Sequence, residues 1–390
     1  MKVSRRRLWN QLLVAGLASL GAAIPVAGSW AEAVDYSAVK EWIDSDQPTA
    51  SGLTPGEVVT QTDIERLRPF VPPGFVGEFD FEGFAAEIQE TGRYLPHASY
   101  RSATLQHSEQ TELAADRSLL HYVSGRPFPA ERVEAAPAED AAYMIAWNQV
   151  FRWQYNGMAI EEEHMAFVRN GEAGGRNEPA LREAFQGGGH VERYLTNSYQ
   201  RVYLNHLAHR AEHGHAHELD QADRLHYMDY LAYLHPFEMR GSAMIIERSL
   251  DPQREDQVNA YLPAERKVRR LSAKERADSF QGSEFTLDDF EGFNGRVLAY
   301  DWIYHGRKSL LYVADTTTGP IVFFGPNSRV PRSRWQLRPC YVVEQRPRVA
   351  DHPYGRKILF VDTETYNIPL ALNFDHDNRL WRVMYGVYEW

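Results

Sequence analysis

Histidines gather in one polar stretch of the chain, "HLAHRAEHGHAHELDQADRLH", together with Asp220 and Asp223. Neutral imidazoles this close in sequence can bind zinc, nickel or copper. The stretch is also interrupted by glycine and strongly polar, which favours a solvated loop, so we expect no resident metal or cofactor. The histidines are His206, His209, His213, His215, His217 and His226, and the middle four would be the ligands if a metal does bind.

Two other groups of reactive side chains point to no catalytic chemistry. The run Glu161-Glu162-Glu163 is followed by His164, but side chains adjacent in sequence do not converge on one point, so we expect a solvated face. Cys340 lies in the strand-like run "CYVVE", which favours a buried, inert thiol. Motifs such as G-x-S-x-G, H-E-x-x-H, G-x-G-x-x-G and C-x-x-C are absent, so we do not expect an enzyme.

The first residues read as an export signal. Lys2 and Arg5 to Arg7 precede an apolar run over residues 12–24, and small residues surround a cleavage site near Ala33. Either the general secretory route or the twin-arginine route would fit. Removing residues 1–33 takes away four Lys/Arg and one Glu, so the net charge changes from −11 to −14. We do not expect a chain with this negative charge to bind nucleic acid, because the phosphate backbone is also negatively charged. No cysteine stands directly after the cleavage site to carry a lipid anchor, so we expect a soluble periplasmic protein.

The remaining chain changes character along its length. Residues 34–130 are rich in proline and glycine and predict loops and short helices that wrap a core. Residues 131–390 predict a sheet domain that packs with the wrapping segment as one globular unit. The best helix spans residues 140–155, with Tyr143, Trp147, Val150 and Phe151 along one stripe.

Beyond Gly241 the sequence predicts an antiparallel meander, because short alternating runs are separated by turns. In "YNIPLALNF", Ile368, Leu370 and Leu372 share one face and Asn373 lies on the other, which predicts one dry and one wet face. The fold class is therefore mainly β with α. The expected strands are 242–249, 256–262, 266–271, 296–304, 309–313, 339–344, 356–362, 366–374 and 379–388.

Several blocks of sequence, in order, resemble a proteobacterial family called domain of unknown function 1329. The most specific are "DQVNAYLPAERKVRRL" and "DDFEGFNG", with "HPFEMRGSAMI" before them and "ILFVDTETYNIPLAL" after them. The resemblance covers roughly residues 50–390. It implies the fold of Lol-type lipoprotein carriers, an antiparallel sheet curled into an unclosed barrel with helices across its concave face. It also implies the handling of lipids, often beside an inner-membrane transporter of the resistance, nodulation and division type and an outer-membrane protein.

These observations together predict a carrier or chaperone for a lipid-like molecule. Alternatively, the apolar strand faces form a solid core without a ligand cavity. The alternative functions are a non-catalytic adaptor between two membranes and a metal-binding protein. The expected lining of a ligand cavity is Trp147, Phe151, Val258, Leu262, Trp302, Tyr304, Ile368, Leu370, Leu372 and Trp381.

A basic limb stands out in this acidic chain. Arg266, Lys267, Arg269 and Arg270 follow one another closely, and like charges so near together repel. An anionic surface or partner would relieve that repulsion, so the limb is a candidate docking patch. A solvated turn is the alternative.

Overall fold

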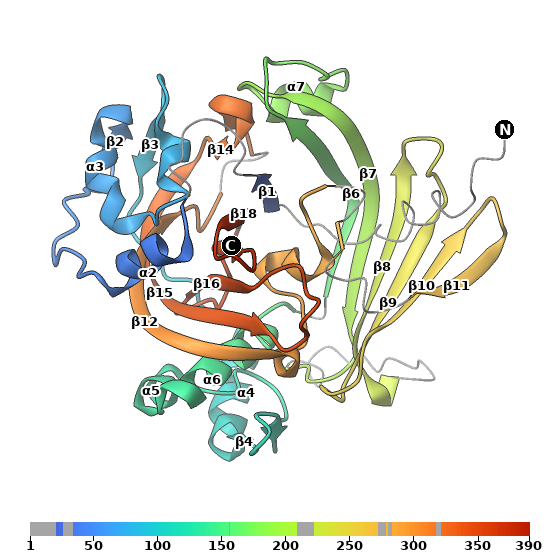
Figure 1. The fold of residues 1–390 in the computed structure, drawn as a ribbon. Coiled ribbons are helices and arrows are strands. Elements are labelled where there is room, and N and C mark those ends of the chain that lie inside the picture. The colour runs from blue at the N-terminus through green and yellow to red at the C-terminus, as the bar shows by residue number, and fades with distance from the viewer. Residues whose placement is uncertain are drawn as a thin grey trace. The chain divides into compact units, whose positions relative to one another are not determined.

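The computed structural model describes residues 21–25, 34–155, 157–208, 222–271, 278–279, 283–316 and 321–390. It divides into two compact units. In the described part, the first unit comprises Leu95–Met165 and Tyr194–Asp301, and the second comprises Leu20–Tyr94, Ala166–Arg193 and Trp302–Trp390. Each unit contains a large sheet with helices, which confirms the mainly β class with helices (Figure 1).

The sheet of the first unit has six strands in the order β11-β10-β9-β8-β7-β6. Neighbours from β7 to β11 are antiparallel, and each is the next strand along the chain, which is the expected meander. Its first three strands precede Gly241 and were not expected. The strands are β6 Gly157–Arg169, β7 His190–Tyr203, β8 Leu225–His235, β9 Ala243–Ser249, β10 Gln257–Leu262 and β11 Lys267–Leu271.

The helix predicted around Trp147 is α6, which spans Ala138–Val150 and so ends earlier than expected. Every residue from 141 to 149 is buried, so the helix is enclosed on all sides rather than along one stripe. Asn148 joins it to the preceding segment by accepting from the backbone N–H of Phe128 and donating to its carbonyl. The other elements are α4 Ala98–His107, η4 Ser108–Gln110, β4 Glu112–Leu113, β5 Leu119–Leu120, α5 Ala130–Ala135, η5 Ala222–Arg224, η8 Leu287–Gly292 and η9 Val297–Ala299.

The sheet of the second unit has eight strands, seven of them in the order β1-β18-β17-β16-β15-β3-β2, with β12 also paired to β15. The predicted strands 296–304 and 309–313 overlap the single strand β12, whereas residues 297–299, predicted as strand, form the 3-10 helix η9. Neither large sheet closes on itself among the described strands, in agreement with the expected unclosed form. The eight strands are β1 Gly21–Pro25, β2 Val58–Thr60, β3 Ala85–Ile88, β12 Tyr300–Tyr312, β15 Arg334–Pro347, β16 Arg356–Asp362, β17 Leu370–Phe374 and β18 Leu380–Gly386. The short strands β13 Phe323–Phe324 and β14 Val330–Pro331 form a separate two-stranded sheet.

Helices of the N-terminal segment pack on this sheet. Asp35 caps α2 by accepting from the backbone N–H of Ala38, and the rings of Tyr36 and Trp42 then meet those of Phe374 and Phe360 edge to face. The expectation of a wet face on β17 was wrong, because all five residues of that strand are buried. The short helices are α2 Tyr36–Asp44, η1 Gln61–Asp63, α3 Ile64–Leu67, η2 Arg68–Phe70, η3 Val76–Phe79, α7 Pro179–Ala184 and η10 Pro326–Ser328.

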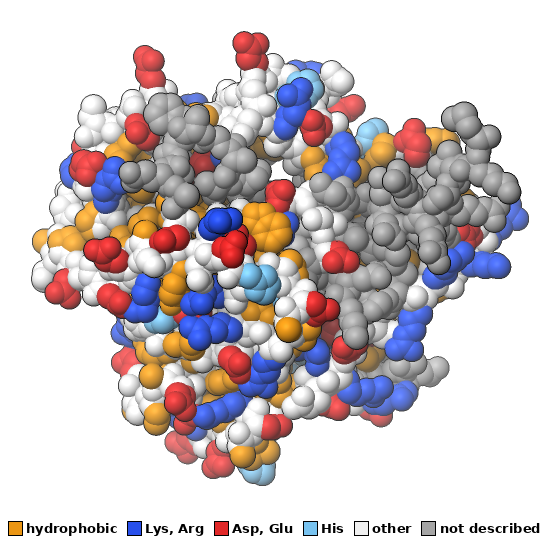
Figure 2. All heavy atoms as spheres, in the orientation of Figure 1, with side chains coloured by type: hydrophobic (Ala, Val, Ile, Leu, Met, Phe, Trp, Pro, Cys, Tyr) orange, Lys and Arg blue, Asp and Glu red, His pale blue; other side chains and the backbone are white. Residues whose placement is uncertain are grey.

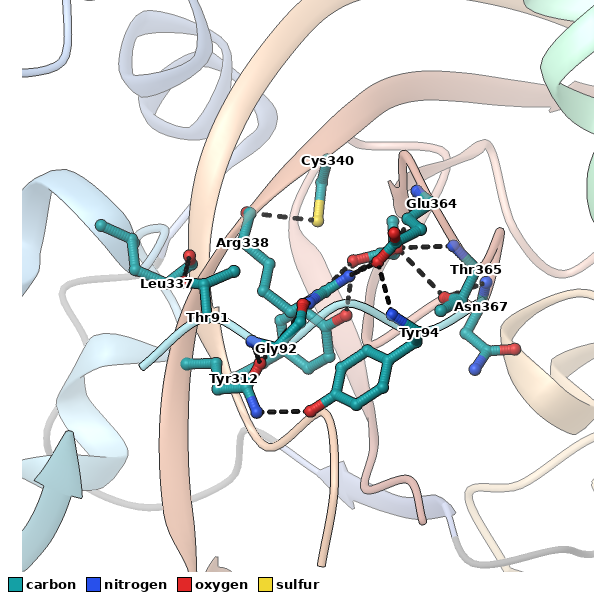
Figure 3. A network of polar contacts seen from close by, with 12 residues as sticks. Thr91, Gly92, Tyr94, Tyr312, Leu337, Arg338, Cys340, Glu364, Thr365 and Asn367 are labelled. Carbon is teal, nitrogen blue, oxygen red and sulfur yellow. Dashed lines mark hydrogen bonds and ion pairs between the residues drawn. The ribbon is translucent and has the colours of Figure 1, made fainter. Parts of the chain in front are cut away.

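A buried ion pair fixes the end of the same N-terminal segment to the sheet (Figure 3). Arg338 on β15 donates through Nε to Asp362 at 2.7 Å and through Nη1 to the carbonyl of Gly92 at 2.6 Å. Tyr312 also donates to Asp362, at 2.8 Å. Burial would raise the pKa of Asp362, but the hydrogen bond and charge of Arg338 lower it below its ordinary value. The pair therefore stays ionised, and it holds three parts of the second unit together.

Candidate functional site

A cavity of about 190 Å³ lies within the first unit. One wall is aromatic and consists of Tyr122, Trp147 and Phe151. The ring of Phe151 lies 4.3 Å from that of Tyr122 and 6.0 Å from that of Trp147, measured between ring centroids. The side chains of Leu119, Val150 and Val297 add aliphatic surface. Such a wall suits an apolar ligand, because concave apolar sites with few polar groups are the usual small-molecule sites.

The end of α6 positions this aromatic wall. Trp147 is held by its indole N–H, which donates to the carbonyl of Arg117 at 2.8 Å. Phe151 comes directly after the last residue of α6, and its backbone is no longer helical. Its ring is therefore not held along the surface of the helix. Tyr122 reaches the same place from the loop after β5, and its hydroxyl donates to the carbonyl of Gly125 at 2.8 Å. Both polar ring groups are thus hydrogen-bonded to backbone, and the faces of the rings line the cavity.

Two histidines form another part of the lining. The ring of His226 on β8 lies 5.0 Å from that of Phe151, and the ring of His206 lies 5.9 Å from that of His226. His206 donates through Nδ1 to the carbonyl of Val123 at 2.8 Å. Burial lowers the pKa of His226 well below its ordinary value and also lowers that of His206. Both imidazoles are therefore neutral near pH 7 and add no charge to the cavity.

Another part of the lining is basic and comes from the segments 248–254 and 295–297. Arg248 is buried and neutralised, since it donates to Asp256 at 3.0 Å and to the carbonyls of Asn294 and Gly295. Arg296 donates to the carbonyl of Gln253, and Arg254 is exposed at the rim. Asp251 is the only carboxylate of the described lining, which also contains three arginines, so the cavity carries a positive excess in an acidic protein.

Of the expected lining residues, Trp147 and Phe151 meet at this cavity. Val258 and Leu262 belong to the same unit and are buried on one face of β10, but they are not among the lining residues. The alternation of buried and more exposed residues expected for the strand 256–262 is thus confirmed. A ligand at the apolar face of this strand stays a prediction. His206, His226 and the arginines were missed as a site, because no local spacing connects them.

The remaining expected lining residues belong to the second unit. Leu370 and Leu372 lie in its packed core, and Ile368 and Trp302 are also buried. The ring of Tyr304 meets that of Tyr341 at 6.1 Å, and Trp381 is exposed beside Arg382. A ligand site built from these side chains stays a prediction. Cys340 is fully buried, as expected, and burial raises the pKa of its thiol.

The basic limb forms the turn after β10 and the edge strand β11. Arg266, Lys267, Arg269 and Arg270 are all exposed, and Arg269 forms an ion pair with Glu265. Figure 2 shows Lys and Arg side chains along the side of the molecule where β10 and β11 lie. A docking role for this limb is taken up below.

The candidate metal ligands His209, His213, His215 and His217 lie outside the described residues. Within the described ranges, no group of three or more His, Cys, Asp or Glu side chains could hold a metal ion. Nor does any helix in that part of the chain have the length and apolar character needed to cross a membrane.

A family model described as "Protein of unknown function (DUF1329)" matches residues 58–389. The chain belongs to this family. The resemblance seen in "DQVNAYLPAERKVRRL" and "DDFEGFNG" is therefore confirmed, and it extends over both units. No curated protein matches the chain.

Solved structures similar to this chain are distant in sequence. A DUF1329 family protein from Desulfovibrio piger is 17% identical, with a TM-score of 0.40 over 64% of this chain and 79% of the other. A putative outer membrane lipoprotein-sorting protein domain from Vibrio parahaemolyticus is 15% identical, with a TM-score of 0.38 over 65% and 75%. A LolA superfamily protein from Nitrosomonas europaea is 11% identical, with a TM-score of 0.32 over 63% and 75%.

Proposed function

We propose that this protein is a non-catalytic periplasmic carrier or chaperone for a lipid-like molecule that has an anionic end. The observation that supports the proposal is the cavity of the first unit, whose lining contains both aromatic rings and arginines. The apolar part of the cargo would lie against Trp147 and Phe151. Its anionic end would meet Arg254 and Arg296, which are the cations of the lining that the described carboxylates leave unpaired.

The size of the cavity fits part of such a cargo. An apolar cavity of about 150 Å³ is sufficient for benzene, so one of about 190 Å³ takes a ring or the end of an acyl chain. The rest of a long chain would extend through the opening. A guanidinium–carboxylate hydrogen bond is about twice as strong as a neutral one, so the basic side selects a carboxylate or phosphate over an alcohol.

Cellular location and partners follow from the export signal and the family resemblance. The carrier would act in the periplasm after removal of residues 1–33, and it would exchange cargo with an inner-membrane transporter of the resistance, nodulation and division type and with an outer-membrane protein. The alternatives are an adaptor that joins those two proteins without binding cargo and, through the histidines at 209–217, a periplasmic metal-binding protein.

The test is displacement of a fluorescent fatty acid from the delipidated protein by dodecanoate, dodecanol and dodecylammonium. We expect dodecanoate to bind best, because it alone satisfies the arginines. Val150→Trp, which fills the cavity from the end of α6, should abolish binding, whereas Leu105→Trp on the exposed side of α4 should not. The double variant Arg254→Glu with Arg296→Glu should weaken the binding of dodecanoate by roughly tenfold and leave the binding of dodecanol unchanged.

Each outcome separates the alternatives. If none of the ligands binds the wild type, the carrier proposal fails and the adaptor takes its place. If all of them bind equally and the charge variants change nothing, the protein carries apolar cargo but does not recognise an anionic end. Metal bound by the wild type and removed by a chelator, without any fatty-acid binding, would favour the metal-binding alternative.

A further inference from the structure

One face of the six-stranded sheet in the first unit is apolar and exposed. Along β8 the side chains alternate, so that Leu231 is buried while its neighbour Tyr230 is exposed. The pairing register places Tyr230 beside Ile245 of β9 and, in the next row, Ala243 beside Tyr261 of β10. Neighbouring strands are about 4.8 Å apart, so these side chains form one continuous patch.

The exposures are too large for side chains that pack inside a protein. Tyr230 and Tyr261 are each 39% exposed, Ile245 is 36% exposed, and Val268 of β11 is 67% exposed. Val268 pairs with Tyr261, so the patch reaches the edge strand. A contiguous apolar patch on a sheet face marks an interaction site more often than isolated apolar residues do.

Basic side chains border the same patch. Arg270 pairs with Asn259 in the row that holds Tyr230 and Ile245, and Arg266 lies in the turn before β11. Lys267 begins β11 and pairs with Leu262, whose side chain is buried on the opposite face, so Lys267 does not belong to this rim. Arg269 has Glu265 as its partner, but within the described part of the chain no carboxylate pairs with Arg266, Lys267 or Arg270. Two cations of the rim, Arg266 and Arg270, thus have no carboxylate partner among the described residues, although the chain as a whole is acidic.

Protection of the sheet edge explains only part of this arrangement. Lys and Arg on an edge strand prevent other strands from pairing there, and β11 is the edge of its sheet. Edge protection gives no reason for exposed tyrosine and isoleucine on β8 and β9, which are interior strands. Tyrosine, aliphatic side chains and Lys/Arg together are the combination that binds at the interface of a bilayer.

We propose that this face, defined by Tyr230, Ile245, Tyr261 and Val268 with the rim Arg266 and Arg270, docks on the surface of an anionic lipid bilayer. The apolar side chains would enter the headgroup region, and the rim would meet the lipid phosphates. The occupant is a bilayer because exposed tyrosine and aliphatic side chains lie beside cations, and this combination is complementary to an anionic headgroup region. The surface is distinct from the cavity and does not depend on cargo binding.

The test is co-sedimentation of the full-length protein with two kinds of vesicle, pure phosphatidylcholine and phosphatidylcholine mixed equally with phosphatidylglycerol. We expect binding to the anionic vesicles only, weakening as salt is added. Each basic residue near an anionic membrane contributes about fivefold to affinity, so Arg266→Glu with Arg270→Glu should reduce binding by at least 30-fold. Tyr230→Ser with Ile245→Ser should also reduce it strongly, without reducing the net charge on the rim.

The cavity variant Arg254→Glu with Arg296→Glu is the matched control, since it makes the same change of charge elsewhere in the unit. It should bind vesicles like the wild type, while the rim variant should still bind dodecanoate, so failure of this proposal is distinguishable from failure of the carrier proposal. Equal binding to both vesicles, or unchanged binding by either surface variant, would overturn the proposal. Self-association of the wild type that Tyr230→Ser with Ile245→Ser abolishes, without vesicle binding, would instead show an interface between two copies.

Discussion

Glu163 on β6 is a buried carboxyl group whose ionisation should oppose folding. Within the described residues, neither carboxyl oxygen of Glu163 has a hydrogen-bond partner. Burial raises its pKa from 4.5 to about 8, and the nearby amide of Asn197 offsets only part of that effect. The side chain is therefore largely protonated at pH 7 in the folded protein, whereas it is ionised in the unfolded chain.

The sign of the effect follows from proton binding. The folded state binds the proton of Glu163 more tightly than the unfolded state does, so the free energy of unfolding falls as pH rises from about 4.5 to about 8. Below about pH 4.5, Glu163 does not change the free energy of unfolding, and above about pH 8 the free energy of unfolding is lowered by the full amount. At about 1.4 kcal/mol for each pH unit, the whole loss is about 5 kcal/mol. Glu163→Gln removes the loss, because the amide does not ionise.

The assay is a series of urea titrations of the wild type and Glu163→Gln between pH 4 and pH 9, with Glu162→Gln as the control on the exposed face of the same strand. We expect Glu163→Gln to match the wild type near pH 4 and to be several kcal/mol more stable near pH 9. Glu162→Gln should follow the wild type throughout. Parallel stability curves for wild type and Glu163→Gln would refute the reasoning, because they would mean that Glu163 ionises equally easily in both states.

Three further expectations concern other parts of the chain. Leu370→Asn should destabilise the protein by about 3 kcal/mol in denaturant titrations, because an amide without partners would lie in a packed core; a cost below about 1 kcal/mol would indicate a cavity there instead. Asp229→Ala should cost about 3 to 5 kcal/mol by the same measurement, since it leaves the buried guanidinium of Arg201 without its main partner, and an unchanged midpoint would contradict this. N-terminal sequencing of the exported protein should find a start near residue 34, and an intact Met1 would argue against a cleaved signal.

The strands that could be predicted are those in which one face is buried and turns are marked by local residues. β9 and β10 satisfy this condition, and their observed bounds lie within a residue of the expected ones. β16 was also predicted with its observed bounds, although both of its faces are buried. β6 was missed because its exposed residues include Glu161, Glu162 and His164, so its sequence resembles a solvated segment. The opposite error occurred in β17, where Asn373 indicated a wet face but tertiary packing buries both faces.

Half of the cavity could be predicted and half could not. Trp147 and Phe151 are four residues apart, a spacing that predicts neighbouring side chains at a helix. In the structure both side chains line the cavity at the end of α6. The segments that bring Arg254 and Arg296 are more than a hundred residues away in the chain, and only the folded first unit brings them to the same cavity as those rings. His206 and His226 were noticed for their crowding, but their neutral state and position at the cavity depend on burial that spacing does not reveal.

The most direct measurement for the carrier proposal is a crystal structure of the delipidated protein grown with 12-bromododecanoate, in which anomalous scattering locates the bromine. The proposal predicts that the ligand occupies the cavity of the first unit, with its apolar chain against Trp147 and Phe151 and its carboxylate beside Arg254 and Arg296. An empty cavity at saturating ligand, or bromine found only among the side chains of the second unit, would contradict it.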